Sequence, residues 1–443
     1  MGRRPIDMDK LVPELVLNTN KDEKEKIAKK IIQIAYKGGI YPSSINEFYM
    51  ARGRGEFPGN FTVPAINLRT LTYDLAKAIF RVAKRNNTAA FIFEIAKSEM
   101  GYTDQPALEY TAVSLAAAIK EGWSGPVFIQ GDHFQVSAKN FKENPEKELE
   151  SIKAVIAHAI ESHFYNIDID SSTLVDLSQG NVRNEQKINY EVSAKLTHFI
   201  RQNQPRGVEI SVGGEIGEVG SKNSTPEELR AFMGGYKERL RKGLTGISKI
   251  SIQTGTSHGG VVLPDGTIAK VKLDFDTLRN LSKIGREEFG LAGAVQHGAS
   301  TLPAEAFGKF PEVGTAEVHL ATEFQNMVYE SGRFPKELKA KMYDWIKANL
   351  GAERKPDQTD EQFIYSARKK ALGPFKKDIM GLPQDTRNAI AKEVEAKFEF
   401  LFEKLNLKDT KNLVLKHTAL KRVISRPRKE VRKDIEISRD GAD

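Results

Sequence analysis

Residues 127–134 read VFIQGDHF. The first four, Val127 to Gln130, form a short apolar-rich run, as expected of a strand that is covered on both faces. A glycine, the carboxylate of Asp132 and the imidazole of His133 follow directly. In α/β barrels, side chains that perform chemistry stand at the carboxyl ends of the strands. The stretch therefore predicts a buried strand that ends in a functional site.

Seven further segments of this kind lie between residues 61 and 331 and alternate with helical stretches such as 71–86, 107–121, 146–162 and 187–203. The eight candidate strands are FTVPAIN (61–67), AAFIFEIA (89–96), GPVFIQGD (125–132), FYNIDID (164–170), GVEISVGGE (207–215), ISKISIQTG (247–255), LAGAVQH (291–297) and TAEVHLA (315–321). Eight strands in this order predict an α/β fold, a (β/α)₈ TIM barrel. A doubly wound open sheet is the alternative.

Both flanks of the barrel differ from it in composition. Residues 1–58 predict an N-terminal helical extension with one amphipathic helix at 21–37, which ends at the glycine-rich stretch ARGRGEFPGN (51–60). Residues 59–334 form the predicted barrel, and residues 335–443 a charged helical extension with a basic, mobile tail. The extension carries an apolar stripe that either packs onto the barrel or forms an oligomer contact: Ile390, Val394, Phe398, Leu401, Phe402 and Leu405.

Composition narrows the function classes. Of 443 residues, 40% are hydrophobic and 28% charged, and no run approaches the roughly 18–20 apolar residues that span a bilayer. The N-terminus has no apolar signal core, so we expect a cytoplasmic protein without a membrane partner. The absence of cysteine excludes disulfides and thiolate metal sites. The net charge of +8 favours anionic partners, but the basic residues alternate with acids, which is typical of solvated helix faces rather than nucleic-acid binding.

Polar side chains that carry chemistry follow five of the predicted strands: Asp132 and His133, Asp168 and Asp170, Glu215, His258, and His297. Three of the eight histidines are in this set. Neutral imidazoles that converge from strand ends form a catalytic zinc site with an open position. Any one of them alone is more often structural, and the shared position favours metal binding. The histidines outside the strand ends are interpreted as ordinary: His158, His163, His198 and His417.

Small residues follow two of these histidines, in HGG (258–260) and HGAS (297–300). Their backbone N–H groups could approach a phosphate closely, and the Ser300 hydroxyl adds a donor. Barrel phosphate sites commonly lie after strands seven and eight. Plain tight turns are the alternative interpretation. The stretch GGEIGEVG (213–220) lacks the glycine spacing of a dinucleotide motif.

The ordered set of blocks resembles the class II, metal-dependent ketose-bisphosphate aldolases, the fructose- and tagatose-bisphosphate aldolase family. The resemblance extends over residues 61–331 and rests on VPAIN (63–67), FIQGDHF (128–134), IDSS (169–172), GGEIGEVG (213–220), GTSHG (255–259), QHGAS (296–300) and VHLATE (318–323).

The resemblance implies a role for each matched residue. It assigns the zinc ligands to His133, His258 and His297, and the catalytic acid/base to Asp132. It makes Asp170 and Glu215 supporting carboxylates near the metal, and assigns phosphate and substrate binding to Asn67, Gly259, Gly298, Ser300, His319 and Thr322. It further implies Zn²⁺, a monovalent cation (Na⁺ or K⁺), a phosphorylated sugar as substrate, a homo-oligomer (dimer or tetramer) and a place in carbohydrate metabolism such as glycolysis.

The implied reaction is cleavage or formation of a C–C bond in a phosphorylated ketose through a metal-stabilised enediolate. Asp132 would take the C4 hydroxyl proton. The chain departs from the family at His319, where an asparagine is usual, and at Gln362, where bisphosphate-specific members carry an arginine. We therefore expect no strong preference for fructose 1,6-bisphosphate. Alternatives are an epimerase on the same scaffold, a non-catalytic aldolase-like subunit and, from charge alone, a nucleic-acid-binding protein.

Overall fold

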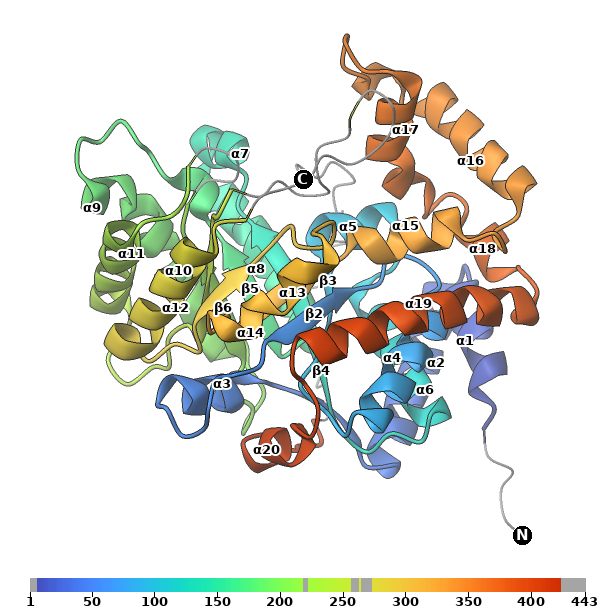
Figure 1. The fold of residues 1–443 in the computed structure, drawn as a ribbon, viewed down its shortest axis with the longest axis horizontal. Helices are drawn as coiled ribbons and strands as arrows, with labels where there is room; N and C mark the ends of the chain where they lie inside the picture. Colours follow the sequence, from blue (N-terminus) through green and yellow to red (C-terminus); the bar gives the residue numbers. More distant parts are fainter. Residues whose placement is uncertain (1–5, 218–221, 256–262, 264–272, 424–443) are drawn as a thin grey trace.

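Eight parallel strands close into a barrel in the computed structural model, which describes residues 6–217, 222–255, 263 and 273–423 (Figure 1). Strands β2 to β9 pair in sequence order, and β9 pairs back with β2. This closure confirms the (β/α)₈ barrel and excludes the open sheet. The strands are β1 (Ile40–Ser43), β2 (Val63–Asn67), β3 (Ile92–Ala96), β4 (Gly125–Gln135), β5 (Asn166–Asp170), β6 (Ser211–Glu215), β7 (Lys249–Ile252), β8 (Ala294–Gln296) and β9 (Glu317–Leu320).

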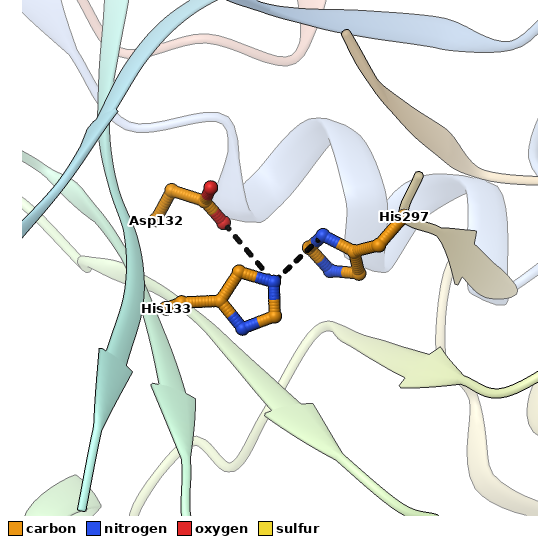
Figure 2. A group of neighbouring side chains, drawn as sticks. All are labelled: Asp132, His133 and His297. Carbon is orange, nitrogen blue, oxygen red and sulfur yellow. Dashed lines mark hydrogen bonds and ion pairs between the residues drawn. The ribbon is translucent and has the colours of Figure 1, made fainter. Parts of the chain in front are cut away.

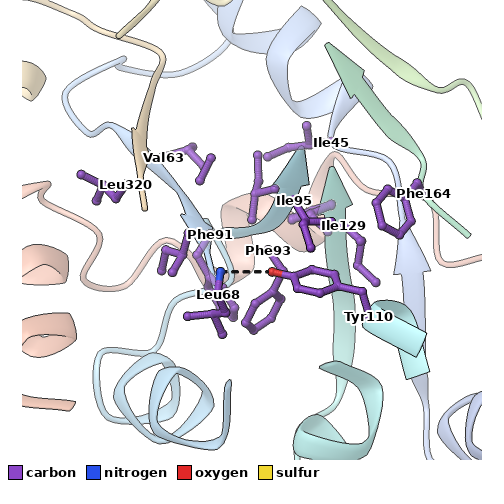
Figure 3. Close-up of a cluster of buried hydrophobic side chains, with 14 of the residues drawn as sticks. Ile45, Val63, Leu68, Phe91, Phe93, Ile95, Tyr110, Ile129, Phe164 and Leu320 are labelled. Atoms are coloured by element: carbon purple, nitrogen blue, oxygen red, sulfur yellow. Dashed lines mark hydrogen bonds between the residues drawn. The ribbon is translucent and has the colours of Figure 1, made fainter. Parts of the chain in front are cut away.

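Apolar side chains of the strands pack against the helices around the barrel. Figure 3 shows Phe93 and Ile95 of β3 beside Ile129 of β4, and none of the three is exposed to solvent. Burying such a side chain stabilises the fold by about 1.5–3 kcal/mol. Tyr110 adds a polar contact, because its hydroxyl accepts from the backbone N–H of Leu68 at 3.4 Å. The apolar character of these runs, visible in the sequence, is thus what places the strands.

Helices alternate with the strands, and α4, α6, α8 and α10 match the predicted helical stretches to within two residues at each end. The helices are α1 (Met8–Val16), α2 (Lys21–Lys37), α3 (Asn46–Gly53), α4 (Thr72–Arg85), α5 (Lys97–Tyr102), α6 (Ala107–Lys120), α7 (Ala138–Glu143), α8 (Pro145–Glu161), α9 (Val182–Glu185), α10 (Lys187–Asn203), α11 (Pro226–Arg239), α12 (Phe275–Phe289), α13 (Ala304–Phe307), α14 (Lys309–Glu312), α15 (Thr322–Glu330), α16 (Lys336–Asn349), α17 (Asp360–Ala367), α18 (Lys376–Met380), α19 (Gln384–Lys404) and α20 (Lys411–Lys416), with short 3₁₀ turns η1 (Ser172–Leu174), η2 (Gly351–Glu353) and η3 (Arg368–Ala371).

The N-terminal segment contains more structure than the single helix expected for residues 1–58, which is a correction. Helix α2 has the predicted bounds, but α1, α3 and the strand β1 accompany it. Strand β1 pairs in parallel with the first half of β4, with Ile40 opposite Gly125. The buried guanidinium of Arg52 donates to the carbonyl oxygens of Phe61 at 2.9 Å and Thr315 at 3.0 Å. These contacts join the segment to the barrel, and the glycine-rich stretch is not a loose linker.

The C-terminal segment packs onto its own barrel. All six residues of its apolar stripe are fully buried. Phe398 of α19 contacts Phe324 of α15 with ring centroids 4.8 Å apart, and Figure 1 shows α19 lying beside α4. The packing interpretation of the stripe is therefore confirmed. The basic tail lies largely outside the described residues. Among the described helices, none is both long and apolar enough to cross a membrane.

Candidate active site

A β-bulge in β4 brings Asp132 and His133 to the same side. Successive side chains of a regular strand point to opposite faces. Here the pairing of β4 with β5 shifts register between Gly131 and Phe134, and His133 has φ of +40°. Such a conformation is uncommon for a residue with a side chain and marks local strain of the kind found at functional sites. Figure 2 shows Asp132 and His297, which follows β8, both pointing to the imidazole of His133.

Gly131 makes the bulge possible. A Cβ atom at this position would lie 2.4 Å from the Phe134 ring, which is a clash. Phe134 is fully buried, so the ring has no room to move away. The glycine before Asp132 is therefore required because the ring of Phe134 packs directly over it.

The imidazoles of His133 and His297 face each other across a short gap. Nε2 of His133 lies 2.8 Å from Nδ1 of His297, and 3.8 Å from Oδ1 of Asp132. One ligand atom from each of the three residues lies within 4.8 Å of the others. Two imidazole nitrogens and a carboxylate oxygen so close together are a donor set that suits a divalent cation. His258 and Gly259, predicted to complete the ligands and the phosphate site, lie outside the described residues.

Two predicted supporting carboxylates flank the far side of His133. Its Nδ1 lies 3.4 Å from Oδ2 of Asp170 and 3.3 Å from Oε2 of Glu215. Burial would raise the pKa of Asp170, but hydrogen bonds from His133, Gln135 and Ser172 outweigh burial and lower it to about 2. Burial and the charge of Asp170 raise the pKa of Glu215 to about 7. One carboxylate thus stays ionised, as needed to orient a ligating imidazole.

A cavity of about 190 Å³ opens beside these residues. Every predicted substrate-binding residue of the described chain lines it: Asn67, Gly298, Ser300, His319 and Thr322. Oγ of Ser300 accepts from the backbone N–H of Ala321 at 2.7 Å, which leaves its own proton to donate toward the cavity. Gly298 has φ of +67°, a conformation that favours glycine. The structure therefore gathers the predicted phosphate-binding groups around one cavity.

Sequence reasoning missed several polar residues of this cavity: Arg69, Glu94, Glu99, Tyr365 and Ser366. Arg69 forms an ion pair with Glu99, with Nη2 2.6 Å from Oε1. Arg69 follows β2 by two residues, so its place near a strand end was a usable signal. Glu94 lies in the middle of the apolar run AAFIFEIA (89–96), and a carboxylate is rarely buried in a core unless it is paired.

His319 lies among carboxylates. Its Nδ1 is 2.8 Å from Oε2 of Glu94 and 3.2 Å from Oδ1 of Asp132, and its Nε2 is 2.7 Å from Oε1 of Glu317. Burial would lower the pKa of His319, but these carboxylates raise it well above its usual value. Burial and the charge of Asp132 raise the pKa of Glu94 to about 8. His319 thus contacts the predicted acid/base directly.

Comparison with known proteins tests the resemblance. The sequence profile of the family described as fructose-bisphosphate aldolase class-II matches residues 57–404. The chain belongs to the class II fructose-bisphosphate aldolase family. No curated protein matches the chain.

Solved structures include similar folds. A probable tagatose 6 phosphate kinase from Sinorhizobium meliloti matches with a TM-score of 0.55 and 14% identity, over 80% of this chain and 99% of the other. A fructose-bisphosphate aldolase from Campylobacter jejuni matches with a TM-score of 0.48 and 16% identity, over 84% and 97%. The first likeness supports the barrel fold of this class II aldolase family member, and the identities are too low to transfer an activity.

Proposed function

We propose that this protein is a zinc-dependent class II aldolase that cleaves or forms a C–C bond in a phosphorylated ketose. The observation that carries the proposal is the group of Asp132, His133 and His297, whose ligand atoms lie within 4.8 Å at the wall of a polar cavity. Membership of the class II aldolase family supports the same reaction.

The metal would be held by His133 and His297 together with His258. The facing imidazole nitrogens of His133 and His297 fit this assignment. Only one of the two can donate a proton to the other, so at least one of them presents a lone pair that a cation can use. A divalent cation bound here would act as a Lewis acid on the ketose carbonyl. The family also suggests a monovalent cation, Na⁺ or K⁺, which stays a prediction.

Asp132 would act as the acid/base. It lies within the bulge in β4 and lines the cavity next to His133, so it can reach a hydroxyl of a substrate bound there. In the cleavage direction it takes the proton of the C4 hydroxyl as the C3–C4 bond breaks, and in the synthetic direction it returns that proton. Gly298, Ser300 and Thr322 would hold the phosphate next to the ketone.

The test combines metal analysis with a retro-aldol screen. Purified protein is analysed for bound metals before and after chelation, and is then assayed on ketose mono- and bisphosphates with identification of the products. We expect one zinc per chain, activity that is lost on chelation, and cleavage into two shorter carbonyl compounds. In the Asp132→Ala variant, turnover should fall about 10²–10⁴-fold while zinc stays bound.

Several outcomes would contradict the proposal. Full activity in a chelator would exclude a metal-dependent reaction. An epimerised sugar of unchanged carbon number would identify an epimerase instead. Turnover of Asp132→Ala within a few-fold of the unmodified protein would show that another group is the acid/base.

A further inference from the structure

The interior of the barrel below the site is ionic. TIM barrels usually fill this space with branched apolar side chains. Here Gln130 of β4, Asp168 of β5, Lys249 of β7 and Glu317 of β9 meet there, and all four are at most 6% exposed. The ammonium of Lys249 donates to Gln130 at 2.8 Å, to Asp168 at 2.9 Å and to Glu317. The charges therefore satisfy one another within the barrel.

This cluster ends at the candidate acid/base. Glu317 accepts hydrogen bonds from Lys249, from Nε2 of Gln130 at 2.9 Å and from the hydroxyl of Tyr49 at 2.5 Å. The same carboxylate lies 2.7 Å from Nε2 of His319. The opposite nitrogen of that ring, Nδ1, lies 2.8 Å from Oε2 of Glu94 and 3.2 Å from Oδ1 of Asp132. One imidazole thus separates the buried carboxylate of Glu317 from the carboxylate at the cavity.

The sequence makes room for this arrangement. Gly213 of β6 faces the pair formed by Asp168 and Lys249, and a Cβ atom there would lie 2.3 Å from Oδ1 of Asp168 and 3.0 Å from Cε of Lys249. Replacing buried ion pairs by apolar residues of similar size is often neutral or stabilising. Stability alone therefore gives no reason to build such a cluster into a barrel core.

We propose that Glu317 and His319 are positioning residues, through which the ionic interior of the barrel fixes the orientation of Asp132. Lys249 and Tyr49 hold the Glu317 carboxylate, Glu317 fixes the ring of His319, and the ring fixes Asp132. The logic is that of a base oriented by a third group. This inference rests on the proposed function, since it explains the network by the acid/base role of Asp132.

The reaction offers a readout that general damage to the fold would not reproduce. Cleavage of fructose 1,6-bisphosphate needs a base for the C4 hydroxyl, whereas hydrogen exchange of dihydroxyacetone phosphate with D₂O involves no C4 hydroxyl. In Glu317→Gln we therefore expect kcat for cleavage to fall about 10- to 100-fold, the scale for a misplaced catalytic group. KM, bound metal and the exchange rate should change less than about threefold.

A double-mutant cycle tests whether Glu317 acts through Asp132. Groups that act as one unit are strongly non-additive. The variant Asp132→Asn/Glu317→Gln should cleave no more slowly than Asp132→Asn alone. Glu109→Gln is the matched control, because Glu109 is also a buried carboxylate between two lysines, Lys24 and Lys376, but lies on α6 outside the barrel. It should leave cleavage and exchange unchanged.

A measurement that needs no turnover separates this inference from the proposed function. Protein labelled with ¹⁵N in its histidine rings is examined by NMR in excess chelator, with His319 assigned by its absence in His319→Asn. Glu317→Gln should move the Nδ1–H resonance, on the side of the ring that faces Asp132. If the unmodified protein neither cleaves nor exchanges, the proposed function has failed and this resonance alone decides the positioning role.

The opposite results would overturn the inference. Additive losses in the double variant, equal losses of cleavage and exchange in Glu317→Gln, or an unmoved Nδ1–H resonance would show a structural network without a link to Asp132. Loss of bound metal in Glu317→Gln would instead show that the cluster supports the metal ligands.

Discussion

Asp132 and His133 show how much chemistry depends on one backbone feature. Their adjacency in the sequence would send the two side chains to opposite faces of a regular strand. The bulge after Gly131 and the positive φ of His133 turn both side chains toward the same site. The sequence predicts that these residues are functional because they end an apolar strand, but the bulge depends on the register between β4 and β5, which a single sequence does not contain.

The interior charges were harder to predict for a similar reason. Lys249 and Glu317 stand inside apolar runs, yet only the closed barrel shows that they point to the same space. Burial would lower the pKa of Lys249, but Asp168 and Glu317 outweigh burial and raise it. The pair of Lys249 and Glu317 is a property of the fold, because it joins strands β7 and β9 through two residues that are 68 residues apart in sequence.

His163 is a residue whose burial predicts a pH dependence of stability. It follows α8 with φ of +66°, is 4% exposed, and its Nδ1 lies 2.9 Å from the Tyr165 hydroxyl. Burial lowers its pKa to about 4, against about 6.5 in an unfolded chain. Between these values the unfolded state binds the additional proton, so the free energy of unfolding falls as the pH falls from 7 to 4. The full difference is about 3 kcal/mol.

His163→Asn should remove this dependence, because asparagine does not titrate and tolerates positive φ. Urea unfolding at pH 7 and pH 4, in excess chelator so that metal release does not contribute, should show the unmodified protein losing about 3 kcal/mol more than the variant. His198→Asn serves as a control: His198 is only half-buried, and burial and Arg241 lower its pKa less than burial lowers that of His163, so this variant should keep most of the loss. Parallel losses in the unmodified protein and His163→Asn would mean that His163 is not held neutral.

At the scale of elements, apolar runs placed the eight barrel strands, and the sequence placed four of the helices between them, α4, α6, α8 and α10. In the N-terminal segment it missed α1, which has apolar residues at helical spacing but a proline, Pro13, inside the helix, and it missed β1 and α3, which depend on the barrel for their structure. Strand β1 has four residues and pairs only with β4, and α3 is held by the buried side chain of Arg52. Short elements of this kind have too few residues to show a period, so contacts distant in sequence decide them.

The segment formed by α17 and η3 contributes three residues to the lining of the cavity: Tyr365, Ser366 and Lys369. Arg368 is buried and donates to Glu330 at 2.7 Å and Asn326 at 2.6 Å, so its guanidinium anchors the segment. Lys369 is the residue of η3 that lines the cavity. A lysine cannot form the bidentate contact of an arginine with a phosphate. The sequence-based expectation of a weak preference for bisphosphates therefore stays a prediction.

We expect kcat/KM for fructose 1,6-bisphosphate to exceed that for fructose 1-phosphate by less than about a hundredfold. This limit corresponds to the roughly 1.5–3 kcal/mol that a charge-assisted hydrogen bond to the second phosphate would contribute. Lys369→Met should lower kcat/KM about 5- to 20-fold for the bisphosphate and leave the monophosphate unchanged. Lys370→Met is the matched control, because Lys370 pairs with Glu353 at 2.6 Å. Equal effects on both substrates would show that Lys369 does not contact a distal phosphate.

Across the whole molecule, the C-terminal extension is joined to the barrel at several points. Oε2 of Glu395 on α19 lies 2.7 Å from Nη2 of Arg81 on α4, and the backbone N–H of Thr62 donates to the carbonyl oxygen of Leu405 at 3.1 Å. The division into residues 1–58, 59–334 and 335–443 stays a prediction about the organisation of the chain. The homo-oligomer also stays a prediction, and the apolar stripe on α19 is already buried within one chain.

These contacts predict that the extension and the barrel unfold together. Phe398→Ala should lower the free energy of unfolding by about 3–5 kcal/mol, because it leaves a cavity against Phe324 in the centre of the interface. Phe400→Ala, a change of the same size at a half-buried position of α19, should cost about 1 kcal/mol or less.

Unfolding would be followed by calorimetry and by tryptophan fluorescence, since Trp123 follows α6 beside the barrel and Trp345 lies in α16 of the extension. Both probes should report one transition that Phe398→Ala moves as a whole. A variant in which only part of the chain melts earlier, or a fragment of residues 1–334 that folds with the stability of the full chain, would show that the extension is an independent unit.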